Sequence, residues 1–395
     1  MSALSGIRVL DFSQVLAGPF AAMLLADLDA EVVKVEPPAH GDHSRQMAPR
    51  VQDGLSGAYL AVNRNKRGVA LDLKDERGRA LAHQLAAQAD VVIENFRPGV
   101  AARLGIDYAT LAALNPRLVH CSISGFGQTG PYSSRGGFDL VAQGMTGLMS
   151  VTGDPDGAPA KCGIPVTDLA TGLFAVYGIL AALNARERTG RGQQVDASLF
   201  DTGIGLAVWE AVEYFHTGKT PGRTGSAHRL GAPYQAFRTS DGYFTVGADG
   251  DRHWPRFCEV IGLPRLPEDP RFTTNDDRLA NREALVAAIE ERTTTRTRDE
   301  WLTLLEEVGV PAGPINSVPE ALSDPHTQAR DMVVDVEHET LGTVRTLGPI
   351  VKLSDTPATI QSPAPGLGEH STEVLTRLGV DESTISALRN EGVIA

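Results

Sequence analysis

The sequence of 395 residues is poor in cysteine and in long apolar runs, and each shortage excludes a class of protein. Its three cysteines, Cys121, Cys162 and Cys258, lie far apart and form no C-x-x-C pair. A sparse, odd set argues against a disulfide framework and predicts a reducing compartment. No apolar run reaches the roughly 18 residues that a membrane span needs, so we predict no membrane partner.

The N-terminus and the charge balance limit the expected location and partners of the protein. The first residues, "MSALSGIRVLDFS", lack the charged start and apolar stretch of a signal peptide, so we predict a cytoplasmic protein. The net charge of −13 argues against nucleic acid as the main partner.

Several well-known catalytic motifs are also missing. The chain has no P-loop, no G-x-S-x-G and no H-E-x-x-H, and its ten histidines show no metal-ligand spacing, so we predict no metal site. A G-x-G-x-x-G pattern occurs at 125–130, but Pro131 and a loop follow it. A dinucleotide fingerprint must open a helix, so this match does not predict a dehydrogenase.

Short β-branched runs alternate with helical patterns through the first 200 residues. We expect strands at 7–12, 31–36, 69–73, 90–96 and 118–124. This alternation predicts an α/β fold with a Rossmann-like parallel sheet, in which ligands bind beyond the carboxyl ends of the strands.

The later part of the sequence indicates a second domain. A turn-rich stretch occupies about 215–235, and a compact mixed segment follows it. We predict a large α/β domain from residues 1–205 that is completed by 330–395, a linker at 206–224, and a smaller α+β domain at 225–325.

One carboxylate stands between a turn and a long apolar helix. In "GIPVTDLATG", Asp168 follows a Gly/Pro turn and precedes the apolar run. Asp is common at helix N-caps, because its oxygen accepts backbone N–H groups. A carboxylate can also act as a covalent nucleophile. This pattern alone favours a helix cap, and the choice between cap and nucleophile depends on the rest of the sequence.

Basic residues flank one of the expected strands and follow another. Arg64, Lys66, Arg67 and Lys74 surround one strand, and the segment "ENFRPGVAARLG" follows another. In an acidic chain, such clusters fit a phosphate-bearing ligand, with a solvated surface as the alternative.

Several motifs occur in a recognisable order along the chain. They are "GIRVLDFSQVLAGPFAAMLLADLDAEVVKVEPP", "NKRGVALDLK", "VVIENFRPG", "GFDLVAQGMTGLMSVTG", "GRGQQVDASLFD" and "PGLGEH". Together they resemble the motifs of the family III coenzyme A transferases, which include formyl-CoA:oxalate and carnitine-related enzymes. The resemblance extends from residue 4 to about 380.

This resemblance implies a fold, a reaction and an assembly. It implies that Asp168 is the nucleophile that passes CoA from an acyl-CoA donor to a free carboxylic acid, through an aspartyl anhydride and an aspartyl-CoA thioester. The segment "GFDLVAQGMTGLMSVTG" favours succinyl-CoA as the donor. CoA would be a substrate, with no permanently bound cofactor, and two chains would interlock as a homodimer.

The resemblance also implies positions for CoA binding. They are Gln14, Val15, Leu16, Ala17, Leu71, Lys74, Asn95, Phe96 and Arg103. Pro37 and Gly136 stand where the resemblance places basic residues, and Arg135 could substitute for the second of them.

Part of the family closes a glycine-only loop over the site, and here that region reads "TGSAHRLG". We therefore expect neither an oxalate nor a formyl enzyme. His228 and Arg229 could read the acceptor carboxylate, with a polar surface loop as the alternative.

Two other functions fit the same fold. An α-methylacyl-CoA racemase needs an acid/base pair, and Phe138 stands where that branch has a histidine. A non-catalytic acyl-CoA binding protein would have no use for Asp168. Both are less favoured than the transferase.

Overall fold

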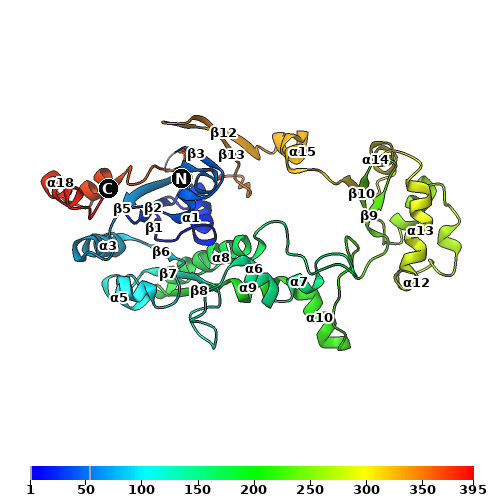
Figure 1. Cartoon of the computed structure of the whole chain (residues 1–395), viewed down its shortest axis with the longest axis horizontal. Coiled ribbons are helices and arrows are strands. Elements are labelled where there is room, and N and C mark those ends of the chain that lie inside the picture. Colours follow the sequence, from blue (N-terminus) through cyan, green and yellow to red (C-terminus); the bar gives the residue numbers. More distant parts are fainter. Residues whose placement is uncertain (1, 53–54) are drawn as a thin grey trace. The chain divides into compact units, whose positions relative to one another are not determined.

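The computed structural model describes residues 2–52 and 55–395, which form two compact units (Figure 1). The first unit comprises the chain up to Leu148, Cys162–Val212 and Pro325–Ala395. The second comprises Met149–Lys161 and Glu213–Asp324.

The first unit is built on a parallel sheet of six strands in the order β5-β2-β1-β6-β7-β8. The sheet confirms the predicted α/β class. Its strands are β1 (Arg8–Asp11), β2 (Glu31–Glu36), β5 (Lys66–Ala70), β6 (Val91–Glu94), β7 (Val119–Ser124) and β8 (Gln194–Ser198).

Helices cover both faces of this sheet, as parallel strands require. One face packs against α3 (Glu76–Gln88), α4 (Val100–Leu104), α5 (Tyr108–Leu114), α17 (Ser371–Arg377) and α18 (Glu382–Asn390). The other packs against α1 (Ala17–Asp27), α6 (Asp139–Met145), α8 (Val166–Thr189) and α9 (Leu199–Leu206). In Figure 1 the C-terminal helix α18, in red, lies near α3 and β5 of the N-terminal half.

The remaining elements of the first unit are short. They are β3 (Arg50–Gln52), β4 (Leu55–Ser56), α2 (Gly57–Leu60), α16 (Pro325–Ala329) and the hairpin β12 (Val333–His338) with β13 (Gly342–Leu347). Helices α7 (Leu148–Val151) and α10 (Val208–Thr217) lie where the chain passes between the units.

The packing of helix α8 explains its apolar composition. By length and composition alone it could cross a membrane. Its Ala175, Ile179 and Ala182 are buried in the core between α1 and the sheet. Leu173 and Tyr177 remain exposed on the opposite face.

The second unit has a three-stranded antiparallel sheet in the order β11-β10-β9. Its elements are β9 (Tyr234–Arg238), β10 (Tyr243–Gly247), α11 (His253–Val260), α12 (Asn275–Ala280), α13 (Arg282–Thr293), α14 (Arg298–Glu307), β11 (Ala312–Pro314) and α15 (Val318–Ser323). Phe237, Phe244, Phe257 and Trp301 fill its core. Strands and helices are mixed here, which fits the α+β class expected for this part.

Some details differ from the sequence-based expectations. Strand β5 covers 66–70 rather than 69–73, and β8 and α18 had no predicted counterpart. The expected linker 206–224 contains α10, and residues 149–161 group with the second unit. Strand β8 was missed because "QVDAS" is an edge strand without a continuous apolar run.

The C-terminal tail completes the core of the first unit, and Leu375 tests this. Leu375 is fully buried beneath β5 and α3. Replacing it with alanine should lower the free energy of unfolding by about 2–5 kcal/mol, because a cavity remains. Urea unfolding measures this, with exposed Leu347→Ala as the control. Equally small losses of stability in the two variants would mean that the tail does not stabilise the unit.

Candidate active site

A cavity of about 480 Å³ opens at the carboxyl ends of the central strands of the first unit. Its volume is typical of a small-molecule site. Residues of the β1–α1 loop, the β6–α4 loop and the segment after β7 line it, together with Asp168 at the start of α8. This is the end of a parallel sheet at which ligands bind.

Another cavity, of about 520 Å³, lies at the opposite ends of β2 and β5. Its lining includes Glu31, Arg67, His370 and Arg377. Arg67 and Arg377 are already ion-paired with carboxylates of the same unit. Because it lies at the amino ends of the strands, we place the candidate site in the first cavity.

Asp168 does not cap its own helix. The N-cap of α8 is Pro165, which makes no side-chain cap, and Asp168 is the third helical residue. The capping carboxylate comes from α6: Asp139 Oδ1 accepts hydrogen bonds from the backbone N–H of Thr167 at 2.9 Å and from its hydroxyl at 2.7 Å. The N-cap role that the sequence pattern alone favoured for Asp168 is therefore wrong.

Gln143 extends this cap to the turn before α8. Its Nε2 donates to Asp139 Oδ2 at 2.7 Å, and its Oε1 accepts from the backbone N–H of Cys162 at 2.8 Å. Gln143 is 1% exposed, so these bonds are shielded from water. Sequence reasoning missed both residues, although Asp139 and Gln143 have the i,i+4 spacing of a helical pair.

The carboxylate of Asp168 makes no hydrogen bond: among the described residues, no side chain or backbone group donates to it. Burial first, and then the negative charge of Asp139, raises the pKa of Asp168 from 3.8 to about 6. The positive end of the helix favours the ionised form, but burial and Asp139 outweigh that effect.

A close helix contact brings the β1–α1 loop to Asp168. Gly172 lies one turn after Asp168, and a Cβ there would come within 2.8 Å of the carbonyl oxygen of Ala17. The absent side chain lets the start of α1 lie directly against α8. The main chain of this loop therefore borders the cavity that Asp168 lines.

The structure brings together part of the predicted CoA-binding set. Gln14, Val15, Leu16, Ala17, Asn95 and Phe96 all line the cavity with Asp168. Asn95 clamps the loop, because its side chain accepts from Gln14 N at 2.8 Å and donates to Gln14 O at 2.7 Å.

Three predicted residues lie outside this lining. Leu71 is a buried core residue, whereas Lys74 and Arg103 sit on the surface after β5 and on α4. Their role in binding CoA stays a prediction.

Basic side chains also line the cavity, and the sequence analysis identified only some of them. Arg97 and Arg135 line it, and so does His43. A Cβ added at Gly136 would lie 2.8 Å from Nη2 of Arg97, so Arg97 supplies positive charge beside the position that lacks a basic residue. Among the described residues, no cluster of three His, Cys, Asp or Glu side chains could hold a metal ion.

His228 and Arg229 belong to the second unit. The His228 Nδ1 accepts from the backbone N–H of Leu230 at 3.2 Å, and its ring lies against Tyr234. Arg229 pairs with Glu213 at 3.4 Å and donates to the carbonyl of Gly222. These contacts order the loop, and a role in acceptor recognition stays a prediction.

Comparisons with known proteins identify the family. CoA-transferase family III matches residues 4–371. A succinyl-CoA:glutarate CoA-transferase from Mus musculus is 40% identical over 395 residues, covering 100% of this chain and 91% of that protein. A succinate–glutarate CoA-transferase from Agrobacterium fabrum is 43% identical over 390 residues, covering 96% of this chain and 97% of that protein.

A solved structure agrees. The crystal structure of a CAIB/BAIF family protein from Brucella suis superposes with a TM-score of 0.86 at 42% identity, covering 95% of this chain and 99% of that one. The chain therefore belongs to CoA-transferase family III, and it is an acyl-CoA:carboxylate CoA-transferase.

The raised pKa of Asp168 predicts a stability effect. Because its folded pKa of about 6 exceeds the ordinary 3.8, its ionisation opposes folding as pH rises from about 4 to 6. Asp168→Asn should therefore raise the free energy of unfolding at pH 7.5 by on the order of 1–2 kcal/mol, after allowance for partial exposure, and change it little at pH 4.

Urea unfolding at both pH values measures this difference. Asp355→Asn, which replaces an exposed carboxyl, is the control and should have a small effect at both. A loss of stability in Asp168→Asn at pH 7.5 would contradict the account of its burial.

Proposed function

We propose that Asp168 is the covalent nucleophile of the transfer. The observation that carries this proposal is an unpaired carboxylate in a cavity bordered by the β1–α1 and β6–α4 loops, while Asp139 performs the capping that a carboxylate at this place would otherwise do. A pKa near 6 leaves Asp168 mostly ionised at neutral pH and more basic than an ordinary carboxylate.

The first half-reaction loads CoA onto the protein. An Asp168 oxygen attacks the thioester carbonyl carbon, the C–S bond breaks, and CoA leaves as thiolate from a mixed anhydride. The thiolate then attacks the carbonyl carbon of Asp168, which releases the donor as a carboxylate that carries away the Asp168 oxygen. The product is an aspartyl-CoA thioester.

The second half-reaction reverses these steps with another acid. The acceptor carboxylate attacks the aspartyl carbonyl, giving a second anhydride and CoA thiolate. Attack of the thiolate on the acceptor carbonyl forms the new acyl-CoA and restores the Asp168 carboxylate. No proton is gained or lost, so the route needs no general base.

The neighbouring residues support this chemistry by position and charge. The Asp139–Gln143 cap fixes the first turn of α8 without occupying the nucleophile. Arg97 and Arg135 supply positive charge to the cavity, which suits anionic substrates. Phe138 also lines the cavity, and its side chain cannot move protons as a racemase requires.

The relatives suggest the substrates. We propose succinyl-CoA as the donor and a dicarboxylic acid such as glutarate as the acceptor, because two relatives of at least 40% identity carry those names. The expectation of a cytoplasmic protein stays a prediction.

Trapping the intermediate tests this proposal. Brief incubation with succinyl-CoA, followed by hydroxylamine and peptide mass spectrometry, should modify the peptide that carries Asp168. Modification should become faster as pH rises through about 6, because the ionised carboxylate reacts. Asp168→Asn should show no adduct and lose at least a hundredfold in transfer, as expected for a lost nucleophile.

Asp201→Asn, in the neighbouring helix α9, is the control and should keep the adduct. Modification of another residue, or equal transfer by Asp168→Asn, would contradict the mechanism. Deuterium entering the acyl α-carbon in heavy water, without an adduct, would favour a racemase.

We further propose that two chains form the interlocked homodimer that the family resemblance implies. An exposed apolar face on the first unit supports this assembly. Its members are Phe138, Leu140, Val141, Met145, Leu173, Phe174, Tyr177, Ile204, Val208 and Trp209, each at least 40% exposed. Single surface apolar residues are ordinary, but a contiguous helix face such as Leu173, Phe174 and Tyr177 indicates a partner.

Light scattering after size exclusion tests the assembly. The native protein should have twice the chain mass of 42.0 kDa. Phe174→Asp combined with Tyr177→Asp should shift it toward the monomer or make it aggregate, because charges would enter an apolar contact. A native protein of single-chain mass would refute the homodimer.

A further inference from the structure

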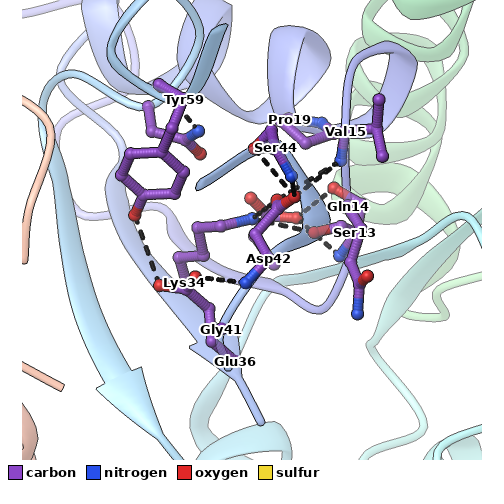
Figure 2. Close-up of polar contacts among 12 residues, drawn as sticks. Ser13, Gln14, Val15, Pro19, Lys34, Glu36, Gly41, Asp42, Ser44 and Tyr59 are labelled. Atoms are coloured by element: carbon purple, nitrogen blue, oxygen red, sulfur yellow. Dashed lines mark hydrogen bonds and ion pairs between the residues drawn. The ribbon is translucent and has the colours of Figure 1, made fainter. Parts of the chain in front are cut away.

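A buried charge cluster lies behind the β1–α1 loop, and Asp42 is at its centre (Figure 2). Asp42 and Lys34 are both fully buried and form an ion pair at 2.9 Å. Lys34 also donates to the carbonyl of Ser13 at 2.8 Å. The cluster therefore reaches the backbone of the loop that borders the cavity of Asp168.

Several donors converge on the two oxygens of Asp42. Ser44 donates through its N–H and its hydroxyl, each at 2.8 Å, and Val15 N–H donates at 3.0 Å. Burial alone would raise the pKa of Asp42, but the charge of Lys34 and these N–H groups outweigh it and lower the pKa to about 2. Asp42 is thus ionised under all ordinary conditions.

The residue that Asp42 holds has an unusual backbone. Val15 has φ of 68°, in the left-handed region. A β-branched residue is rarely found there, because its side chain crowds the backbone. Such a conformation persists only where surrounding contacts enforce it. Here Asp42 binds the N–H of Val15, and Asn95 binds both sides of Gln14.

The enforced turn sets what the loop presents to the cavity. Leu16 and Ala17 follow Val15 at the start of α1 and line the cavity with Asp168. Among the described residues, no group accepts a hydrogen bond from the backbone N–H of Leu16 or of Ala17. A Cβ at Gly18 would lie 2.2 Å from that of Ser13, so the loop folds tightly onto the first turn of α1. A change of φ at Val15 would redirect this whole segment.

We propose that Asp42 is a positioning residue for the transfer reaction: it holds Val15 in the left-handed conformation, and so fixes the main chain of residues 15–17 against CoA and the Asp168 adduct. It acts through Val15 and does not touch the substrate. This role rests on the proposed function for the rate of adduct formation, whereas its effect on CoA binding can be tested alone.

A comparison of Asp42 with Asp27 separates the positioning role from a general effect on stability. Asp27 is 3% exposed and pairs with Arg64 at 2.6 Å, so it resembles Asp42 in burial and charge. It lies at the far end of α1, about 15 Å from the loop at the helical rise per residue. Asp27→Asn should therefore lower stability without reaching residues 15–17.

The experiment measures CoA affinity by calorimetry and the rate of the Asp168 adduct with succinyl-CoA. Asp42→Asn should lower both at least tenfold, because an amide cannot accept from Lys34 on one side and from Val15 and Ser44 on the other. Asp27→Asn should stay within threefold of the native protein. Val15→Gly should rescue the defect: when Asp42→Asn is added to the Val15→Gly variant, it should cost less than threefold, since glycine takes φ of 68° freely.

Equal losses from Asp42→Asn in the native protein and in the Val15→Gly variant, or equal effects of Asp42→Asn and Asp27→Asn, would overturn the proposal. If the native protein formed no adduct, the proposed function would fail and CoA affinity alone would decide this inference.

A second comparison does not require Asp42→Asn to fold. Val15→Gly should melt at a higher temperature than Val15→Ala, because only glycine relieves the positive φ. A higher melting temperature for Val15→Ala would show that the left-handed turn is not enforced, and would overturn the proposal.

Discussion

The interaction on which the site depends is the hydrogen bonding of Asp139 to Thr167. By accepting from the N–H and hydroxyl of Thr167, Asp139 satisfies the start of α8 from a neighbouring helix. Asp168, the third residue of α8, then does not cap the helix and has no hydrogen-bond partner among the described residues. The same carboxylate adds negative charge near Asp168, so the group that caps α8 also raises the pKa of Asp168.

The β1–α1 loop, which also borders the cavity, depends on buried charges of another kind. Lys34, Lys66, Asp11 and Asp42 are all buried, with at most 2% of each residue exposed. Lys66 donates to Asp11 at 2.9 Å and to the carbonyl of Pro19 at 2.9 Å, so α1 is tied to the sheet. Ion pairs of this kind contribute little net stability, because desolvation offsets their attraction. Their effect here is on conformation, since they hold a loop whose backbone would not adopt its shape unaided.

Much of the fold could be read from the sequence, and less of the site. The β-branched runs at 31–36 and 118–124 predicted buried parallel strands, because a strand covered on both faces must be apolar throughout. Asp168 could be noticed because a carboxylate after a Gly/Pro turn is a local pattern, but only the family resemblance implied a catalytic role for it. Asp139 and Asp42 could not, because their partners lie 28 and 27 residues away and only the folded chain brings them together. The raised pKa of Asp168 could not be predicted either, because it depends on burial and on Asp139, and neither is a local property of the sequence.

The central claim is that Asp168 exchanges an oxygen atom with the substrates, and a single turnover with ¹⁸O-labelled glutarate tests it most directly. The protein is first loaded with CoA from unlabelled succinyl-CoA, and the labelled acid is then added. The covalent route predicts that one ¹⁸O atom appears in the peptide that carries Asp168, while the released succinate stays unlabelled. Label in the succinate of the first turnover, with none in that peptide, would mean that the two acids react directly and that Asp168 is not the nucleophile.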